Sequence, residues 1–184
     1  MEIIDITQEL FSCNVYPGDR KPSFERVKQL PEDNYQLTDF SLSSHNGTHI
    51  DAPLHFIAEG QAVDELDLST FYGPCLVAEQ LDAAAIAAAY CHEGRLLLKG
   101  KLEITPAIAQ SVAQSKLRLL GVESQSVGPV DAPMEVHRIL LGAGIVLLEG
   151  LDLSQALPGN YTLSAFPMKL GGCEGAPVRA VLIR

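Results

Sequence analysis

The second half of the chain alternates short apolar runs with segments suited to helices. Three of these runs have the length of buried strands: residues 96–98, 117–122 and 145–148. Three helices are expected around them: residues 81–90 with Asp82 as cap, residues 105–115 with Thr105 as cap and Pro106 at the first helical position, and residues 134–141 ending at Gly142. Helices that alternate with short strands predict a mixed α/β domain.

The rest of the chain contains weaker strand signals. Short strands are expected at residues 3–6, 75–78, 161–166 and 178–183. Residues 34–43 alternate loosely, with Tyr35, Leu37, Phe40 and Leu42 at the apolar positions. Tyr16-Pro17-Gly18-Asp19 has the composition of a turn. With 184 residues and no repeat or linker, the chain is expected to form one domain over residues 1–184.

Composition limits the classes of binding partner and the cellular locations that are expected for the protein. Hydrophobic residues make up 47% of the chain and the formal charge is −10, which argues against nucleic acid and anionic membranes. No apolar run approaches the ~20 residues of a membrane span, and the start lacks the features of a signal peptide. The four cysteines are scattered, so free thiols in a cytoplasmic protein are expected.

Three of the five histidines lie within eleven residues. His45, His49, Asp51 and His55 form an H-x3-H-x-D-x3-H pattern, and such side chains are ligands for zinc or a similar divalent ion. All four positions are odd-numbered, so an extended chain would present them on one face. A helix would also align His45 with His49, but Gly47 and Pro53 disfavour it.

We therefore expect an extended segment that turns at Ala52-Pro53. His45, His49 and Asp51 would hold one metal from a single strand, and His55, just past the turn, would be free for proton transfer.

A site built on one strand needs further ligands, and His137 and Glu149 are the candidates. Glu149 follows the apolar run 145–148, where a carboxylate is costly unless it is paired or binds a metal. The alternatives are a glutamate that reaches solvent at the strand end and a solvated histidine on the helix. His92 is interpreted as a histidine near a helix C-terminus and not as a ligand.

The segment H-N-G-T-H-I-D-A-P-L-H resembles the H-x-G-T-H-x-D-x-P-x-H signature of the metal-dependent cyclase/hydrolase family, which includes bacterial kynurenine formamidase and isatin hydrolase. Four other segments resemble elements of that family: Asp5-Ile6-Thr7 with Tyr16-Pro17-Gly18-Asp19, Gly121 to Val127, Ala165-Phe166-Pro167, and Ala176-Pro177-Val178-Arg179-Ala180. The separation of His137 from Glu149 also resembles the family's spacing.

The resemblance implies a fold, a set of ligands and an assembly. The fold would be a swivelling β/β/α domain, an α/β arrangement in which helices flank a mixed sheet, in a homodimer or larger homo-oligomer. His45, His49 and Asp51 would bind a first divalent ion and His137 a second, with Asp51 and Glu149 between the two. The metal would be Zn²⁺ or alternatively Mn²⁺, one or two per subunit.

The resemblance also implies a reaction on a small-molecule substrate. The chain would hydrolyse amide-type bonds as an arylformamidase does with N-formylkynurenine in tryptophan catabolism, with metal-bound hydroxide as nucleophile and His55 as general acid and base. Tyr16 and Ser126 would contact the substrate.

Two departures from the formamidases keep alternatives open: the connection between residues 98 and 117 is short, and the chain has no tryptophan. A hydrolase of a cyclic amide or ester, a metal-binding module without catalysis and a structural domain with incidental histidines are the alternatives.

Overall fold

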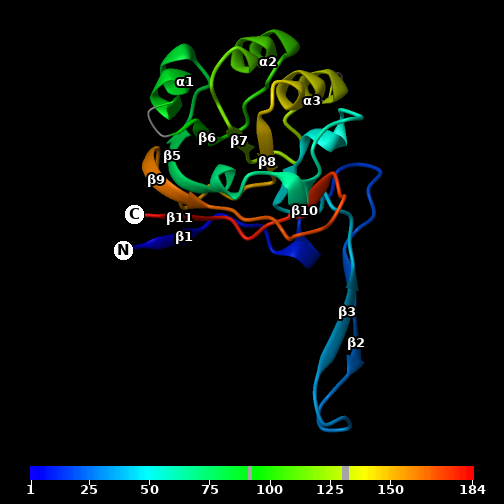
Figure 1. The fold of residues 1–184 in the computed structure, drawn as a ribbon. Helices are drawn as coiled ribbons and strands as arrows, with labels where there is room; N and C mark the ends of the chain where they lie inside the picture. The colour runs from blue at the N-terminus through cyan, green and yellow to red at the C-terminus, as the bar shows by residue number, and fades with distance from the viewer. Residues whose placement is uncertain (91–92, 130–132) are drawn as a thin grey trace.

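The computed structural model describes residues 1–90, 93–129 and 133–184, and a nine-stranded mixed sheet forms its centre (Figure 1). The strand order is β1-β11-β9-β5-β6-β7-β8-β4-β10. These strands are β1 (Ile3–Asp5), β4 (His49–Asp51), β5 (Tyr72–Ala78), β6 (Arg95–Leu98), β7 (Leu119–Val122), β8 (Val146–Glu149), β9 (Gly159–Ser164), β10 (Gly175–Pro177) and β11 (Val181–Ile183). The first and last strands of the chain pair with each other, so the two termini lie side by side.

Helices connect the parallel part of the sheet. Strands β5, β6, β7 and β8 are mutually parallel, whereas the outer strands pair antiparallel. The connections are α1 (Ala83–Tyr90), α2 (Pro106–Ala113) and α3 (Pro133–Gly142). Figure 1 shows the three helices together over one face of the sheet. A parallel pair needs such a crossover, because its strands run in the same direction.

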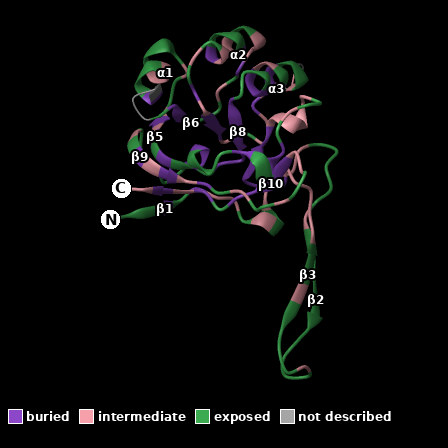
Figure 2. Cartoon of the chain, viewed as in Figure 1, coloured by how far each residue is buried: buried purple, intermediate pink, exposed green. Residues whose placement is uncertain are grey.

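The central strands are buried on both faces (Figure 2). Leu96, Leu98 and Leu120 pack with the helices, whereas Leu97 and Leu119 pack into the cluster on the opposite face. This two-sided burial explains why these strands have continuous apolar runs in the sequence instead of alternation.

The predicted α/β elements are confirmed, with small shifts at their ends. Asp82 Oδ1 accepts a hydrogen bond from the Ala85 amide at 2.8 Å, and Thr105 Oγ1 accepts one from the Ile108 amide at 3.3 Å. The Tyr16–Asp19 turn forms, with Gly18 at φ +99°. Strands β2 (Ser23–Lys28) and β10 were not predicted.

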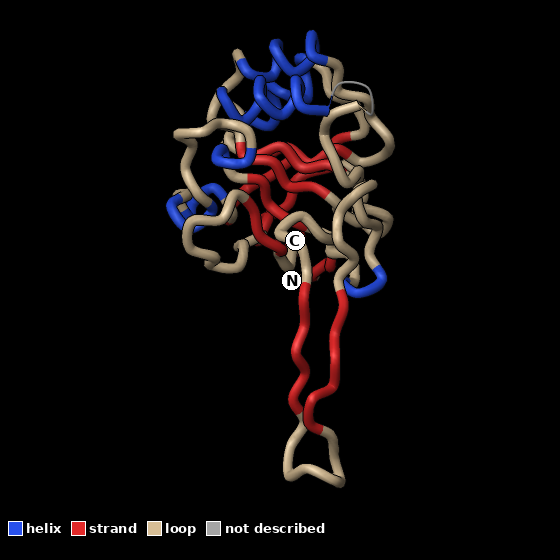
Figure 3. The backbone as a smooth tube through the Cα atoms, turned by 90° about the vertical axis from the view of Figure 1, so that its right-hand side faces the viewer, coloured by secondary structure: helices blue, strands red, loops and turns tan. Residues whose placement is uncertain are grey.

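A two-stranded arm projects from the molecule (Figure 3). It consists of β2 and β3 (Leu37–Ser41), which form a sheet of their own. The loose alternation over residues 34–43 therefore belongs to a hairpin outside the main sheet. Short 3₁₀ turns lie elsewhere, at Leu10–Ser12, Pro53–His55, Val63–Glu65 and Leu68–Thr70.

In the described residues, no helix is long and apolar enough to cross a membrane. Cys13, Cys75 and Cys173 are free thiols, as expected. Cys91 and His92 lie outside the described residues, so the interpretation of His92 stays a prediction.

Candidate metal centre

The pairing of β4 with β8 brings three of the predicted ligands together. His49 and Glu149 are direct partners across the two antiparallel strands. His49 and Asp51 lie on one face of β4, while Ile50 between them packs into the opposite core. Glu149 shares its face of β8 with Leu147, which packs on the helix side of the sheet. The three side chains therefore meet on the side that α3 covers.

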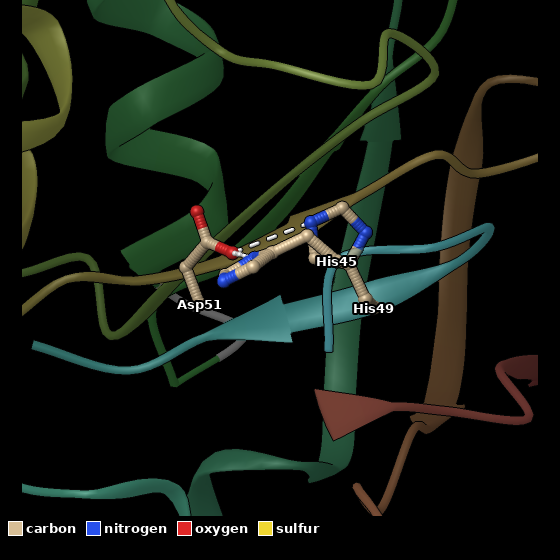
Figure 4. Close-up of side chains that lie close together, drawn as sticks. All are labelled: His45, His49 and Asp51. Atoms are coloured by element: carbon tan, nitrogen blue, oxygen red, sulfur yellow. Dashed lines mark hydrogen bonds and ion pairs between the residues drawn. The ribbon is translucent and has the colours of Figure 1, made fainter. Parts of the chain in front are cut away.

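His45 reaches this group from outside the strand. Only His49–Asp51 is a strand, whereas His45 lies in a turn, so the prediction that one strand carries all three residues was wrong. Gly47, at φ +65°, redirects the chain between the two histidines. The turn still places His45 Nδ1 2.8 Å from Asp51 Oδ1 (Figure 4).

Helix α3 supplies His137. Its Nε2 lies 3.2 Å from Glu149 Oε1 and 3.5 Å from Asp51 Oδ2. His137 and Glu149 are only 4% and 2% exposed, so the alternatives of a solvated helix histidine and a solvent-facing glutamate were wrong. Glu149 Oε1 also accepts a hydrogen bond from the Val127 amide at 2.7 Å.

Each of the three histidines near Asp51 has its outward ring nitrogen next to an oxygen acceptor. His49 Nδ1 lies 2.9 Å from Gly47 O, and His137 Nδ1 lies 2.6 Å from Pro133 O. His45 Nε2 lies 3.2 Å from Glu174 Oε1. Histidines that bind metals usually donate their second N–H to such an acceptor, which fixes the tautomer and the ring orientation. The inward nitrogens are thereby directed toward the carboxylates.

The residues fit a divalent ion. Two groups have ligand atoms within 4.8 Å of one another: His45, His49 and Asp51, and Asp51, His137 and Glu149. Asp51 belongs to both and is fully buried, yet its Oδ2 has no hydrogen-bond partner among the described residues. A buried carboxylate oxygen without a partner is costly, and a cation between imidazole and carboxylate ligands would satisfy it.

The carboxylates strongly affect the histidines of the centre. Burial alone would lower the pKa of His49, but hydrogen bonds and charge attraction from Asp51 and Glu149 raise this pKa to about 10. Burial would also lower the pKa of His137. The hydrogen bond and negative charge of Glu149 outweigh burial, so the pKa of His137 is raised. In Asp51, burial is outweighed by His45 and His49, which hold the carboxyl pKa below its usual range. The centre therefore attracts positive charge.

His55 lies beside the centre and differs from the other histidines. It ends the 3₁₀ turn Pro53–His55, and its ring stacks on His45 with centroids 4.1 Å apart. It belongs to neither ligand group, and no hydrogen bond of its ring to a described residue is found. Burial lowers the pKa of His55, so its ring is neutral at pH 7.

A cavity of about 280 Å³ opens onto the histidines. The predicted substrate residues Tyr16 and Ser126 both line it. Phe56, Pro133 and Met134 form its apolar part.

Sequence reasoning missed three polar residues of this region: Asp19, Gln125 and Glu174. Asp19 and Gln125 line the cavity, and Gln125 Nε2 lies 3.3 Å from Gly47 O, the acceptor of His49. Asp19 and Gln125 lie within segments that resemble family elements, so those segments could have indicated them. Glu174 has no such local signal, because only the pairing of β10 with β4 brings it near His45.

Comparisons with known proteins agree with this geometry. Residues 4–99 match the family described as putative cyclase. A kynurenine formamidase of Salinibacter ruber is 36% identical, with 99% of this chain and 97% of that protein covered. A solved structure of a predicted metal-dependent hydrolase from Bacillus stearothermophilus superimposes with a TM-score of 0.80 at 25% identity, covering 98% and 97% of the two chains.

Isatin hydrolase A from Labrenzia aggregata has the same fold, with a TM-score of 0.77 at 24% identity, covering 98% of this chain and 93% of that one. These superpositions confirm the predicted fold, an α/β domain with helices on a mixed sheet.

Proposed function

The chain belongs to the putative cyclase family, and on that premise we propose that it is a metal-dependent hydrolase of amide C–N bonds, of the arylformamidase type. One observation carries the proposal: three histidines and Glu149 converge on the buried Asp51 carboxylate, whose Oδ2 has no hydrogen-bond partner among the described residues, beside a cavity that a fourth histidine lines. The relatives named kynurenine formamidase support N-formylkynurenine as substrate.

His45, His49, Asp51, His137 and Glu149 would hold the metal, one ion or two per subunit. Their nitrogen and oxygen donors favour Zn²⁺, with Mn²⁺ as the alternative. A divalent ion supplies Lewis acidity, which polarises a carbonyl and makes water easier to deprotonate at neutral pH. Asp51 contributes to both groups of ligands, and this shared position supports two neighbouring sites.

His55 is the proposed general acid and base. Its neutral ring can accept a proton from the attacking water and donate it to the leaving nitrogen of the cleaved amide. The stack on His45 keeps the ring over the ligands, and the Phe56 ring, in a T-shaped contact with centroids 4.3 Å apart, limits its movement. The lack of a ring hydrogen bond to a described residue leaves the imidazole nitrogens available.

The cavity is proposed as the substrate pocket. Phe56, Pro133 and Met134 provide apolar contacts for an aromatic ring, whereas Tyr16 and Ser126 offer hydroxyl groups for polar substituents. A volume of about 280 Å³ suits a single-ring amide rather than a peptide.

We also propose that the protein is a homodimer or larger homo-oligomer. The arm exposes large apolar side chains, including Phe24, Phe40, Leu30 and Tyr35. A two-stranded hairpin alone in water is only marginally stable, so a second copy that covers the arm would explain these side chains. A cytoplasmic location is proposed from the free thiols.

Metal analysis combined with a substrate panel tests the proposed function. We expect about one or two equivalents of zinc or manganese per chain and hydrolysis of N-formylkynurenine and formanilide that stops with a chelator and returns with metal. Hydrolysis of isatin alone would overturn the substrate class. Metal binding without hydrolysis of any of these would indicate a non-catalytic module, and a protein without metal affinity would overturn the proposal.

A further inference from the structure

Glu174 contacts the metal centre from its outer side. Its Oε1 lies 3.2 Å from His45 Nε2 and accepts a hydrogen bond from Ser44 Oγ at 2.6 Å. The carboxylate is 39% exposed and does not line the cavity. It therefore touches a candidate ligand without reaching the substrate pocket.

The backbone around Glu174 fixes this contact. Glu174 O accepts a hydrogen bond from the Ala52 amide at 2.9 Å, directly after Asp51. The next residue, Gly175, pairs with Asp51 across β10 and β4. A side chain at Gly175 would come within 2.8 Å of His45 Cε1, so the glycine makes room for the imidazole. The chain around Glu174, which immediately precedes β10, thus leaves room for the His45 ring.

His45 needs this support more than the other two histidines. The outward nitrogens of His49 and His137 lie next to backbone carbonyls inside the fold. His45 comes from a turn, its side chain is 15% exposed against 1% for His49, and its outward nitrogen lies next to a side chain. The orientation of His45 therefore rests on a group that a substitution can remove.

We propose that Glu174 is a positioning residue of the metal centre, which rests on the proposed function. Its carboxylate accepts the Nε2–H of His45, keeps Nδ1 directed at Asp51, and holds the ring face on which His55 stacks. Through His45, Glu174 thereby raises the affinity for the metal. Through the stacking of His55 on His45, it also supports proton transfer by His55.

The test is the affinity of the full chain for Zn²⁺, measured by competition with a chromophoric chelator. We expect Glu174→Ala to weaken binding by about 10–100-fold, the range for removal of a partner of a ligating histidine. Glu174→Gln keeps an amide oxygen that can accept the same hydrogen bond, so its loss should stay below about tenfold. The zinc-saturated Ala variant should show a lower kcat with KM unchanged, because Glu174 does not line the cavity.

Ser44→Ala is the matched control. It removes the other hydrogen bond of the carboxylate and leaves the contact with His45 in place, so zinc affinity should stay within about threefold of wild type. Thermal unfolding with a chelator establishes that each variant folds.

The inference is overturned if the Ala variant binds zinc as wild type does, if Ser44→Ala reproduces its loss, or if the Gln variant is as weak as the Ala variant. Failure of wild type to bind zinc would instead overturn the proposed function.

Discussion

The two groups of ligands differ in how the chain assembles them. His45, His49 and Asp51 come from one short segment and border solvent at His45, whereas Asp51, His137 and Glu149 come from three elements and are buried. In the first group His45 comes from a turn and contacts Glu174, and in the second His137 from α3 reaches the carboxylates on β4 and β8. The first group, His45, His49 and Asp51, is therefore local enough to form a sequence motif, whereas the fold must bring His137 and Glu149 to it.

Asp51→Asn should have the largest effect, because Asp51 is shared by both groups. The amide removes the negative charge that faces all three histidines. We expect metal affinity to fall by more than about 100-fold, since even the outer partners of ligands contribute 10–100-fold. Metal content after dialysis and the rate of formanilide hydrolysis should fall together. A variant that keeps both metal equivalents would show that the two groups do not share a ligand.

His55→Ala should separate chemistry from metal binding. We expect kcat to fall by about 10²–10⁴-fold, the usual contribution of a general acid or base. Metal content should equal that of wild type, because His55 belongs to neither group. If this variant loses metal instead, His55 is a ligand and the division of roles is wrong.

His137→Ala and His45→Ala compare the stability of the two groups without metal. In the presence of a chelator, we expect His137→Ala to lower the free energy of unfolding by about 3 kcal/mol, because it removes one of the two imidazoles that face the buried Glu149 carboxylate. The partly exposed His45 should contribute about 1 kcal/mol.

Urea unfolding monitored by circular dichroism measures both values. If both variants lose the same free energy of unfolding, burial does not make the second group contribute more to stability than the first.

Gln125→Ala should have the smallest effect on metal affinity. The effect should be confined to the ligand group of His45, His49 and Asp51. Gln125 Nε2 approaches Gly47 O, which also accepts from His49. We expect metal affinity to fall by less than about tenfold, since the bond of His49 itself remains. Gln114→Ala, at an exposed position on the C-cap of α2, is the control. A loss as large as that of Asp51→Asn would mean that Gln125 takes part in the centre directly.

Much of the centre could be predicted from local features. Caps and apolar runs located α1, α2 and the central strands, because those signals act within a few residues. The proximity of His45, His49 and Asp51 followed from their spacing, although His45 reaches Asp51 through a turn and not along a strand.

Other features depend on contacts between distant segments. Glu174 is 129 residues from His45 in sequence, and β10 is only three residues long, so no periodic pattern marks either. Strand β2 was missed because all six of its residues are exposed, and an exposed strand lacks the alternation that burial imposes.

A crystal structure of the metal-loaded protein, with anomalous diffraction at the metal edge, would show which of these residues bind the metal. We expect anomalous peaks within about 2.0–2.2 Å of ligand atoms from His45, His49 and Asp51, and from Asp51, His137 and Glu149 if a second ion is bound. The ring of His55 should lie outside coordination distance and face the cavity. A peak coordinated by His55, or the absence of a peak at Asp51, would contradict the account.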